Sequence, residues 1–237
     1  MAGPELVLTN KKGSKLTAEL IRISKTEATV KRASDQKVFV LPLASLDEAS
    51  VQMVEKHRGK LEEFYPEYES TVVVGKRNVD RDQSFAKKTQ TVTSTVRIKN
   101  LDPNVDSPKV KGRIVFFGHN QSRNTKYSVL ATRDFEVEPE SEKTTELVLA
   151  PFETEYYRGY SDWGFRYEGY ILMLYGQKNK IVHHMSKNAT INRAIEDNFG
   201  LLEIFRQTQE KTEFGKDFTP LDEQGRRKGG DVITVKE

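Results

Sequence analysis

Apolar and polar residues alternate in short runs along most of the chain, with a period close to two residues. Such alternation indicates β-strands that bury one face. Between residues 70 and 190 the β-rich runs follow one another without a helical run between them; they cover residues 72–74, 91–99, 110–117, 127–138, 144–150, 167–175 and 180–185. Short strands separated by turn residues in this way are typical of an antiparallel β-sandwich. We therefore expect a mainly β protein with a sandwich at about residues 70–190.

The first sixty residues predict a second, smaller β unit. Strands are expected at residues 5–9, 16–22, 26–31 and 36–40, and Pro42 ends the last one because it has no N–H for the ladder. Ser45 and Glu48 have the spacing of a capping box, and Gly59 is the expected end of the short helix that follows. This pattern predicts a small, strongly bent barrel with a terminal helix at about residues 1–60.

Two further segments complete the predicted organisation. Residues 61–69 are acidic, contain Pro66 and read as a linker. Residues 191–237 form an amphipathic helix and a tail, because apolar residues recur there at three- and four-residue steps over about 190–208. Gly200 leaves open whether this is one helix or two shorter ones. The tail ends in a strand-like stretch at 231–235.

Composition narrows the classes of function. The chain has 237 residues, with 38 Lys and Arg against 35 Asp and Glu, so the net charge is only +3. A nucleic-acid binder usually has a concentrated basic face, so we predict no nucleic-acid partner. The short lysine and arginine clusters, Lys11 and Lys12 included, are interpreted as solvated surface. No apolar run approaches the ~20 residues of a membrane-spanning helix, so we predict no membrane span. The absence of cysteine removes disulfides and thiolate chemistry.

The sequence offers little for catalysis. The four histidines are His57, His119, His183 and His184. Adjacent residues of a strand point to opposite faces, so His183 and His184 cannot both bind one ion, and we predict no metal site. The chain contains no Gly-x-Ser-x-Gly elbow and no glycine-rich phosphate or dinucleotide motif. We predict no catalytic residue and no cofactor, and hence a protein that is not an enzyme.

Residues 6–56 resemble a known family of small barrels. The residues that carry the resemblance are Leu8-Thr-Asn10, Gly13, Leu16-x-Ala18-x-Leu20, Thr29-Val-Lys31 and Val38-x-Val40-x-Pro42-Leu43-x-x-Leu46. They resemble the SH3-like homology domain first named in a yeast endocytic adaptor, copies of which occur in many exported bacterial proteins. Leu8 replaces the usual aromatic residue before Thr9, and Asp47 and Ser50 replace the expected Ser and Asp. The resemblance implies a partner- or envelope-associated module without catalytic residues.

The second unit is similar to the immunoglobulin-like sandwiches attached to such barrels. The matching segments are Glu168-Gly-Tyr-Ile-Leu-Met-Leu-Tyr175, Lys180-Ile-Val182 and Ser186-x-Asn188. Comparable sandwiches occur in bacterial surface and pilus-associated proteins. The resemblance implies work outside the cytoplasm, in the periplasm or extracellular space. The N-terminus shows no signal peptide, so the alternatives are a mature exported form and a cytoplasmic protein.

Aromatic residues are concentrated in one segment, 152–170. It contains eight aromatic side chains, together with arginines and glycines. Tyr and Trp give a large contact area with a polar tip, and Arg accompanies them in binding hot spots. One interpretation is a binding platform, and the other is that these rings pack under one end of the sandwich. Strand alternation places Tyr167 inward, and the predicted binding residues are Tyr156, Tyr157, Arg158, Tyr160, Trp163 and Arg166.

These observations give two main hypotheses for function, and a third, a nucleic-acid adaptor, that the small net charge disfavours. The first is a non-enzymatic, exported binding or structural module of the bacterial cell envelope that engages a protein partner or a surface assembly, such as a pilus. The second is a carbohydrate-binding or carbohydrate-active protein that uses residues 152–170 as a platform for a glycan. The oligomeric state is left open by the sequence.

Overall fold

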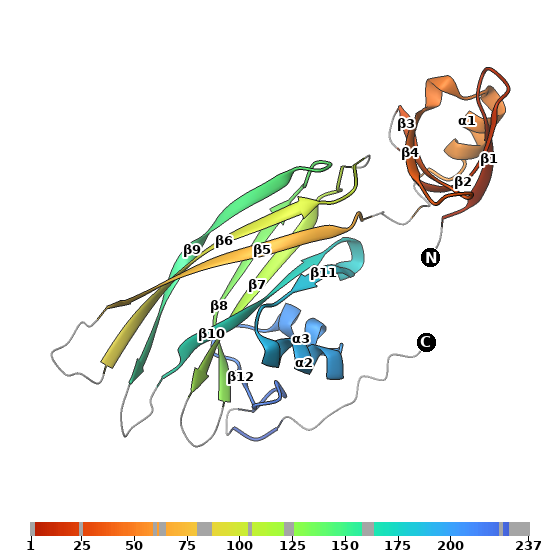
Figure 1. Cartoon of the computed structure of the whole chain (residues 1–237). Helices are drawn as coiled ribbons and strands as arrows, with labels where there is room; N and C mark the ends of the chain where they lie inside the picture. The colour runs from red at the N-terminus through yellow and green to blue at the C-terminus, as the bar shows by residue number, and fades with distance from the viewer. Residues whose placement is uncertain are drawn as a thin grey trace.

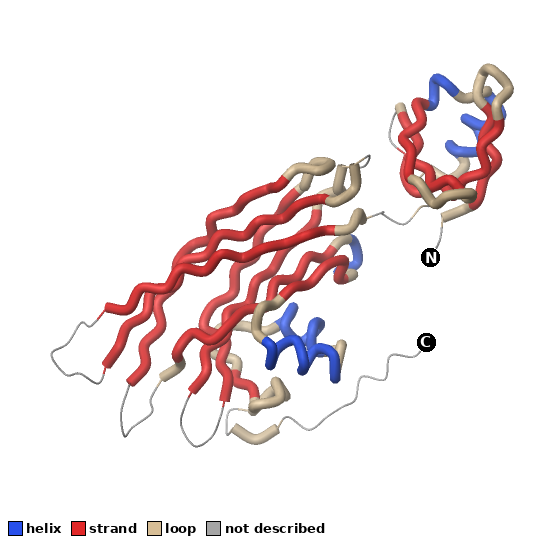
Figure 2. The backbone as a smooth tube through the Cα atoms, viewed as in Figure 1, coloured by secondary structure: helices blue, strands red, loops and turns tan. Residues whose placement is uncertain are grey.

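A computed structural model describes residues 3–23, 26–58, 61, 65–79, 87–103, 106–120, 126–157, 164–222 and 225–227. This part of the chain is mainly β, with three antiparallel sheets and a few short helices (Figures 1 and 2). The first sheet curls into a half-barrel of four strands, and the other two face each other as layers. The described residues include no helix long and apolar enough to cross a bilayer.

Residues 3–58 form the N-terminal half-barrel. Its strands occur in sequence order, each paired with the next; they are β1 (Glu5–Thr9), β2 (Lys15–Ile23), β3 (Glu27–Arg32) and β4 (Val38–Pro42). A 3₁₀ turn, η1 (Leu43–Ser45), and one helix, α1 (Glu48–Glu55), follow. Leu8, Leu20 and Val30 are fully buried inside the curl together with Val54 of α1. The four strands predicted from the alternation are confirmed, and so is the end of the last strand at Pro42.

The predicted start of α1 at a capping box is wrong. Asp47, not Ser45, is the N-cap, and its carboxylate accepts from the backbone N–H of Ser50 at 2.8 Å. The Ser45 hydroxyl instead donates to the carbonyl of Pro42 at 2.7 Å. Ser45 belongs to the 3₁₀ turn, Leu43–Ser45, so the helix begins only after the next side chain that can act as an N-cap, Asp47. Gly59, the expected end of this helix, lies outside the described residues.

Two sheets make up the second unit. One has three strands in the order β5-β6-β9, and the other has five in the order β11-β10-β7-β8-β12. The strands are β5 (Tyr68–Val79), β6 (Lys87–Asn100), β7 (Val110–Asn120), β8 (Lys126–Val137), β9 (Thr144–Tyr157), β10 (Arg166–Tyr175), β11 (Ile181–Met185) and β12 (Glu213–Phe214). Every predicted run between 70 and 190 lies on one of these strands. Most of the strands are longer than the runs, but β8 ends one residue before the run 127–138 does, and β11 begins one residue after the start of the run 180–185. β5 begins inside the segment predicted as a linker, residues 61–69.

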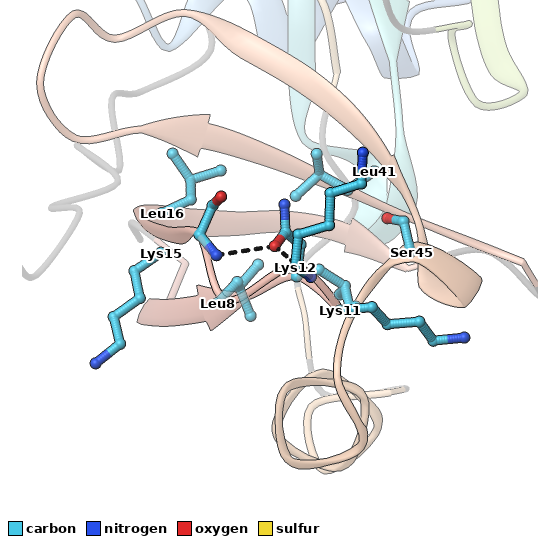
Figure 3. Close-up of a pocket in the computed structure, with 10 residues that line it drawn as sticks. Leu8, Lys11, Lys12, Lys15, Leu16, Leu41 and Ser45 are labelled. Carbon is cyan, nitrogen blue, oxygen red and sulfur yellow. Dashed lines mark hydrogen bonds between the residues drawn. The ribbon is translucent and has the colours of Figure 1, made fainter.

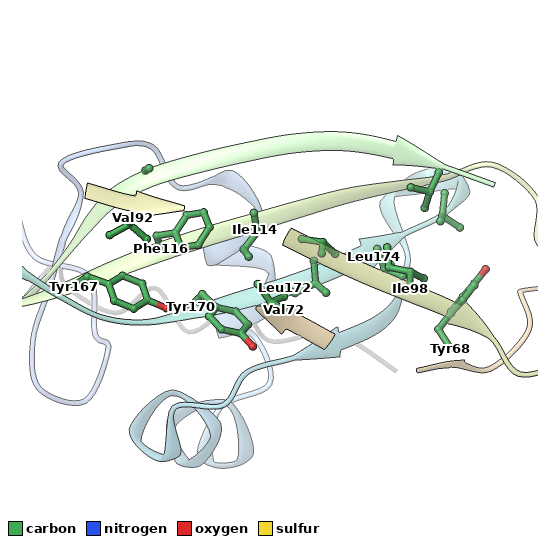
Figure 4. Packing of buried hydrophobic residues seen from close by; sticks show 14 residues of the cluster. Tyr68, Val72, Val92, Ile98, Ile114, Phe116, Tyr167, Tyr170, Leu172 and Leu174 are labelled. Atoms are coloured by element: carbon green, nitrogen blue, oxygen red, sulfur yellow. The ribbon is translucent and has the colours of Figure 1, made fainter. Parts of the chain in front are cut away.

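The two sheets share an apolar core (Figure 4). Val96 and Ile98 of β6 meet Ile114 and Phe116 of β7 and Leu172 of β10, and all five are fully buried. Phe152 of β9 leans on Phe116 with ring centroids 4.9 Å apart. Burial of this kind, roughly 25 cal/mol for each Å² of apolar surface, is the main force that holds the layers together.

Two short helices cover the outer face of the five-stranded sheet, α2 (Ala189–Asp197) and α3 (Leu201–Gln207) (Figure 1). Asn188 caps α2 by accepting from the backbone N–H groups of Thr190 and Ile191. The helix ends at Asn198, and α3 restarts after Gly200, which confirms the two-helix alternative. Because this sheet is covered on both faces, β10 is buried without interruption from Gly169 to Tyr175. The strand-like stretch expected at 231–235 lies outside the described residues.

Candidate binding pocket in the N-terminal half-barrel

A pocket of about 410 Å³ opens beside the turn between β1 and β2 (Figure 3). It draws on the end of β1, the turn, the start of β2, β4 and the 3₁₀ turn. The lining residues are Leu8, Asn10, Lys11, Lys12, Ser14, Lys15, Leu16, Leu41, Ser45 and Leu46. Leucines supply the apolar surface, and three lysines stand around it.

The first wall of the pocket is a turn that Asn10 organises. Its side-chain oxygen accepts from the backbone N–H of Lys12 at 3.0 Å and of Ser14 at 2.9 Å. Gly13 has φ +84°, a left-handed conformation that other residues adopt only at a cost. The Asn and Gly together therefore fix the direction in which the three lysines leave the backbone.

The second wall is the 3₁₀ turn, which is tied to the first by backbone hydrogen bonds. The N–H of Lys11 donates to the carbonyl of Ser45 at 3.0 Å, and Asn10 forms an isolated β-bridge with Leu46. Behind this wall, Ser50 accepts from the N–H of Thr9 at 2.8 Å and holds α1 against β1. Hydrogen bonds from the hydroxyl and the N–H of Ser50 lower the pKa of the Asp47 carboxyl, so this cap is charged at neutral pH.

The pocket combines an apolar floor with a cationic rim. Leu8 and Leu46 are buried, whereas Leu16 and Leu41 are half-buried and reach the opening. Lys11, Lys12 and Lys15 are exposed. In Figure 3, Lys11 and Lys15 extend in opposite directions from the turn, so their charges flank the floor. The ten lining residues include no carboxylate and no histidine, so the pocket can bind an anionic, partly apolar group but has no group for acid–base catalysis.

Sequence reasoning missed this pocket. The sequence shows Lys11 and Lys12 only as a basic pair, which local reasoning assigns to solvated surface. Their partners Leu16, Leu41 and Leu46 are distant along the chain, and only the curl of the sheet brings them beside the turn. The available signal was the resemblance itself, since Asn10, Gly13, Leu16 and Leu46 are among the residues that carry it.

The structure places the predicted aromatic site only in part. Tyr156 and Tyr157 are half-buried at the end of β9, where they pair with Lys88 and Lys87. Arg166 is exposed at the start of β10 and pairs with His119. Arg158, Tyr160 and Trp163 lie outside the described residues. The partner-binding role of all six residues stays a prediction.

Several other rings of segment 152–170 belong to the core. Tyr167 and Tyr170 are buried, and burial raises the pKa of both hydroxyls. Phe152 contacts Phe116, as described above. The Thr154 hydroxyl donates to the carbonyl of Phe165 at 2.7 Å, which joins β9 to the residues just before β10. The inward direction expected for Tyr167 agrees with the structure.

Comparisons with known proteins leave the family open. No protein-family model and no curated protein sequence matches the chain. A crystal structure from Akkermansia muciniphila is similar over 61% of this chain and 78% of its own, with 12% identity and a TM-score of 0.26. A beta-glucosidase from Kluyveromyces marxianus is similar over 58% of this chain and 16% of its own, with 13% identity and a TM-score of 0.20. We draw nothing about function from scores this low.

The two neighbouring histidines have separate surroundings. His183 Nε2 is 2.7 Å from the Ser70 hydroxyl, which connects β11 of one sheet with β5 of the other. The His184 ring meets Phe199 edge-on, with centroids 5.8 Å apart. Among the described residues, no group of three or more His, Asp or Glu is placed to hold a metal ion. No carboxylate in the described part of the chain hydrogen-bonds to Ser70 or His183, so we interpret this contact as a structural hydrogen bond between the two sheets.

The buried His183 of this hydrogen bond predicts a pH dependence of stability. Burial, and then the neighbouring His184, lower the pKa of His183 from its ordinary value of 6.5. The unfolded chain therefore binds this proton more tightly than the folded one, so the free energy of unfolding should fall as the pH drops below about 6.5. The loss should level off below the folded-state pKa. Urea denaturation between mildly alkaline and mildly acidic pH would measure it, with His183→Gln giving a shallower profile. An equally steep profile for the variant would assign the loss to other groups.

Proposed function

We propose that the chain is a non-enzymatic binding protein that holds an acidic segment of a protein partner in the pocket of the N-terminal half-barrel. The observation that carries the proposal is the set of three exposed lysines around a leucine floor, in a pocket without acid or histidine. An apolar side chain of the partner would enter between Leu16 and Leu41, and its neighbouring carboxylates would meet the ammonium groups. Lysine charges at a rim steer association and select the sign of the partner, while the apolar contact supplies affinity.

We further propose that the half-barrel is of the SH3-like type and that the second unit is an immunoglobulin-like sandwich. The strand order β5-β6-β9 against β11-β10-β7-β8 supports this, because it corresponds to sheets A-B-E and G-F-C-C′ of that fold. The resemblance of residues 6–56 to barrels in exported bacterial proteins supports a place in the cell envelope, as part of a surface assembly. In this arrangement the sandwich is the scaffold and the half-barrel carries the recognition site.

The test is peptide binding by fluorescence anisotropy. The probe is a pool of labelled peptides in which one leucine or phenylalanine is flanked by Asp and Glu, compared with the same pool carrying Lys and Arg. Only the acidic pool should bind, and binding should weaken with salt. Changing Lys11, Lys12 and Lys15 together to Glu should weaken binding by about tenfold or more, because three attractions become repulsions.

The matched control changes the same charge elsewhere. Lys180, Lys187 and Lys216 are exposed in the second unit, and their triple change to Glu alters the net charge equally. This control should retain binding. Equal losses in the two triple variants would reduce the effect to net charge, and unchanged binding in the pocket variant would refute the proposal. Circular dichroism melting of both variants checks that they are folded.

A further inference from the structure

The three-stranded sheet has one guarded edge and one open edge. At the β9 edge, Arg133 of β8 donates to the carbonyls of Ala150 at 3.1 Å and Pro151 at 3.3 Å. Pro151 also lacks an N–H, so β9 is poorly suited to accept another strand. At the other edge lies β5, twelve residues long. Within the described part of the chain, no strand pairs with its outer side.

The ladder between β5 and β6 determines which groups point to the open edge. The register of this ladder is constant, without a bulge, from Tyr68 opposite Asn100 to Val79 opposite Thr89. One step beyond, the N–H of Leu101 donates to the carbonyl of Glu67 at 3.0 Å. Hydrogen-bonded positions alternate in an antiparallel ladder, so the odd-numbered residues of β5 bond to β6. The backbone groups of Ser70, Val72, Val74 and Lys76 therefore point to the open edge.

The side chains on the outer face of β5 are self-complementary. In order they are Glu69, Thr71, Val73, Gly75 and Arg77. Glu69 and Arg77 are exposed at opposite ends of β5. None of the ion pairs among the described residues includes either of them. Val73, midway between them, is 50% exposed. Turning a second β5 about an axis through Val73 sets Glu69 of each copy opposite Arg77 of the other.

We infer that β5 pairs with β5 of a second copy of this chain, antiparallel and centred on Val73, to make one continuous six-stranded sheet. Charged residues on an edge usually keep strands apart. Here a parallel approach would place like charges together, whereas the two-fold arrangement pairs opposite charges twice. Val73 lies on the axis as a non-hydrogen-bonded pair, the position where facing side chains are closest. This surface is separate from the lysine-rimmed pocket, so the two proposals stand or fall independently.

The chain has no cysteine, which makes single-cysteine variants clean reporters of this geometry. Facing residues of a non-hydrogen-bonded pair lie about 4.5 Å apart at Cα, within the range of a disulfide. Val73→Cys should form a disulfide dimer on mild oxidation. Val148→Cys is the matched control, because Val148 is 80% exposed on β9 and lies away from the axis. It should cross-link much more slowly at equal protein concentration.

Sedimentation velocity over a concentration series tests the charge pairing. The wild-type chain should pass from monomer to dimer as concentration rises. Arg77→Glu should raise the dissociation constant about tenfold, since both symmetry-related pairs become repulsive. Adding Glu69→Arg to that variant should restore the wild-type constant. The inference would be overturned if the chain stayed a monomer at every concentration or if the two cysteine variants cross-linked equally. It would also be overturned if Arg77→Glu left the dissociation constant of the dimer unchanged.

Discussion

Alanine at Phe117 should lower the free energy of unfolding by about 3–5 kcal/mol, the usual cost of removing a fully buried phenylalanine. Phe117 of β7 is completely buried and lies under α3 and the C-terminal segment. Its ring is 5.2 Å from Phe205, 5.9 Å from Phe214 and 5.2 Å from Phe218, measured between centroids. The substitution leaves a cavity between three other rings, which are anchored to separate segments and cannot close around it together.

Urea denaturation followed by circular dichroism measures this effect. The matched control is Phe199→Ala, because Phe199 is the same residue type but is 66% exposed just before α3. Its loss should stay within about 0.5 kcal/mol, as is usual for surface substitutions. A small loss at Phe117 would mean that the helices contribute little to the stability of the sheet beneath them.

Alanine at Gly164 should cost roughly 2–5 kcal/mol, the sum of a left-handed backbone penalty and an overpacking penalty. Gly164 has φ +84°, and a Cβ there would lie 2.1 Å from the carbonyl oxygen of Glu155. That oxygen belongs to the backbone of β9, which cannot swing aside as a side chain can. The glycine also forms an isolated β-bridge with Tyr156, so it determines where the chain returns to β10.

Gly13→Ala separates the two contributions. Gly13 also has φ +84°, but a Cβ there would meet nothing within 4 Å. Its substitution should cost only the backbone penalty of about 1–2 kcal/mol. Melting temperatures and urea midpoints of the two variants provide the comparison. If both glycines proved equally costly to replace, the close approach of β9 to Gly164 would be contradicted.

The strands were predictable because each needs only local information. In the run 91–99, Val92, Val96 and Ile98 alternate with threonine and arginine, and Ser94 takes the remaining inward position. The structure buries all four of these inward side chains. The extension of β5 to Val79 was not predictable. Gly75, Lys76 and Arg77 carry no apolar pattern, and they are held in the strand by pairing with β6.

The sequence contained a signal for the packing of helices on the five-stranded sheet, but reasoning about single segments did not use it. The unbroken apolar run at the end of β10 requires cover on both faces, and the amphipathic stretch after residue 190 is what supplies it. The prediction of the N-cap of α1 failed for a different reason. Ser45 and Asp47 are both good N-cap residues, and the choice depends on where the preceding turn ends.

The candidate pocket was beyond local reasoning. Its leucines come from β1, β2, β4 and the residue after the 3₁₀ turn, so their meeting depends on the curvature of a sheet. The aromatic segment shows the opposite difficulty. Composition marked it clearly, but the same tyrosine can be core or surface, and Tyr167 is core while Tyr157 is partly exposed.

The cover over β7 and β10 is the last part of the described chain to be synthesised. When a nascent chain has emerged only as far as β11, the three-stranded sheet and all but β12 of the five-stranded one are available. Val115, Phe117, Ile171 and Met173 then have nothing on their outer side until α2, α3 and Phe218 follow. Exposed apolar sheet of this kind is prone to aggregate. Truncation or stalling near residue 186 should therefore produce an insoluble product. Once the remaining residues have been synthesised, α2, α3 and Phe218 bury this face of the sheet.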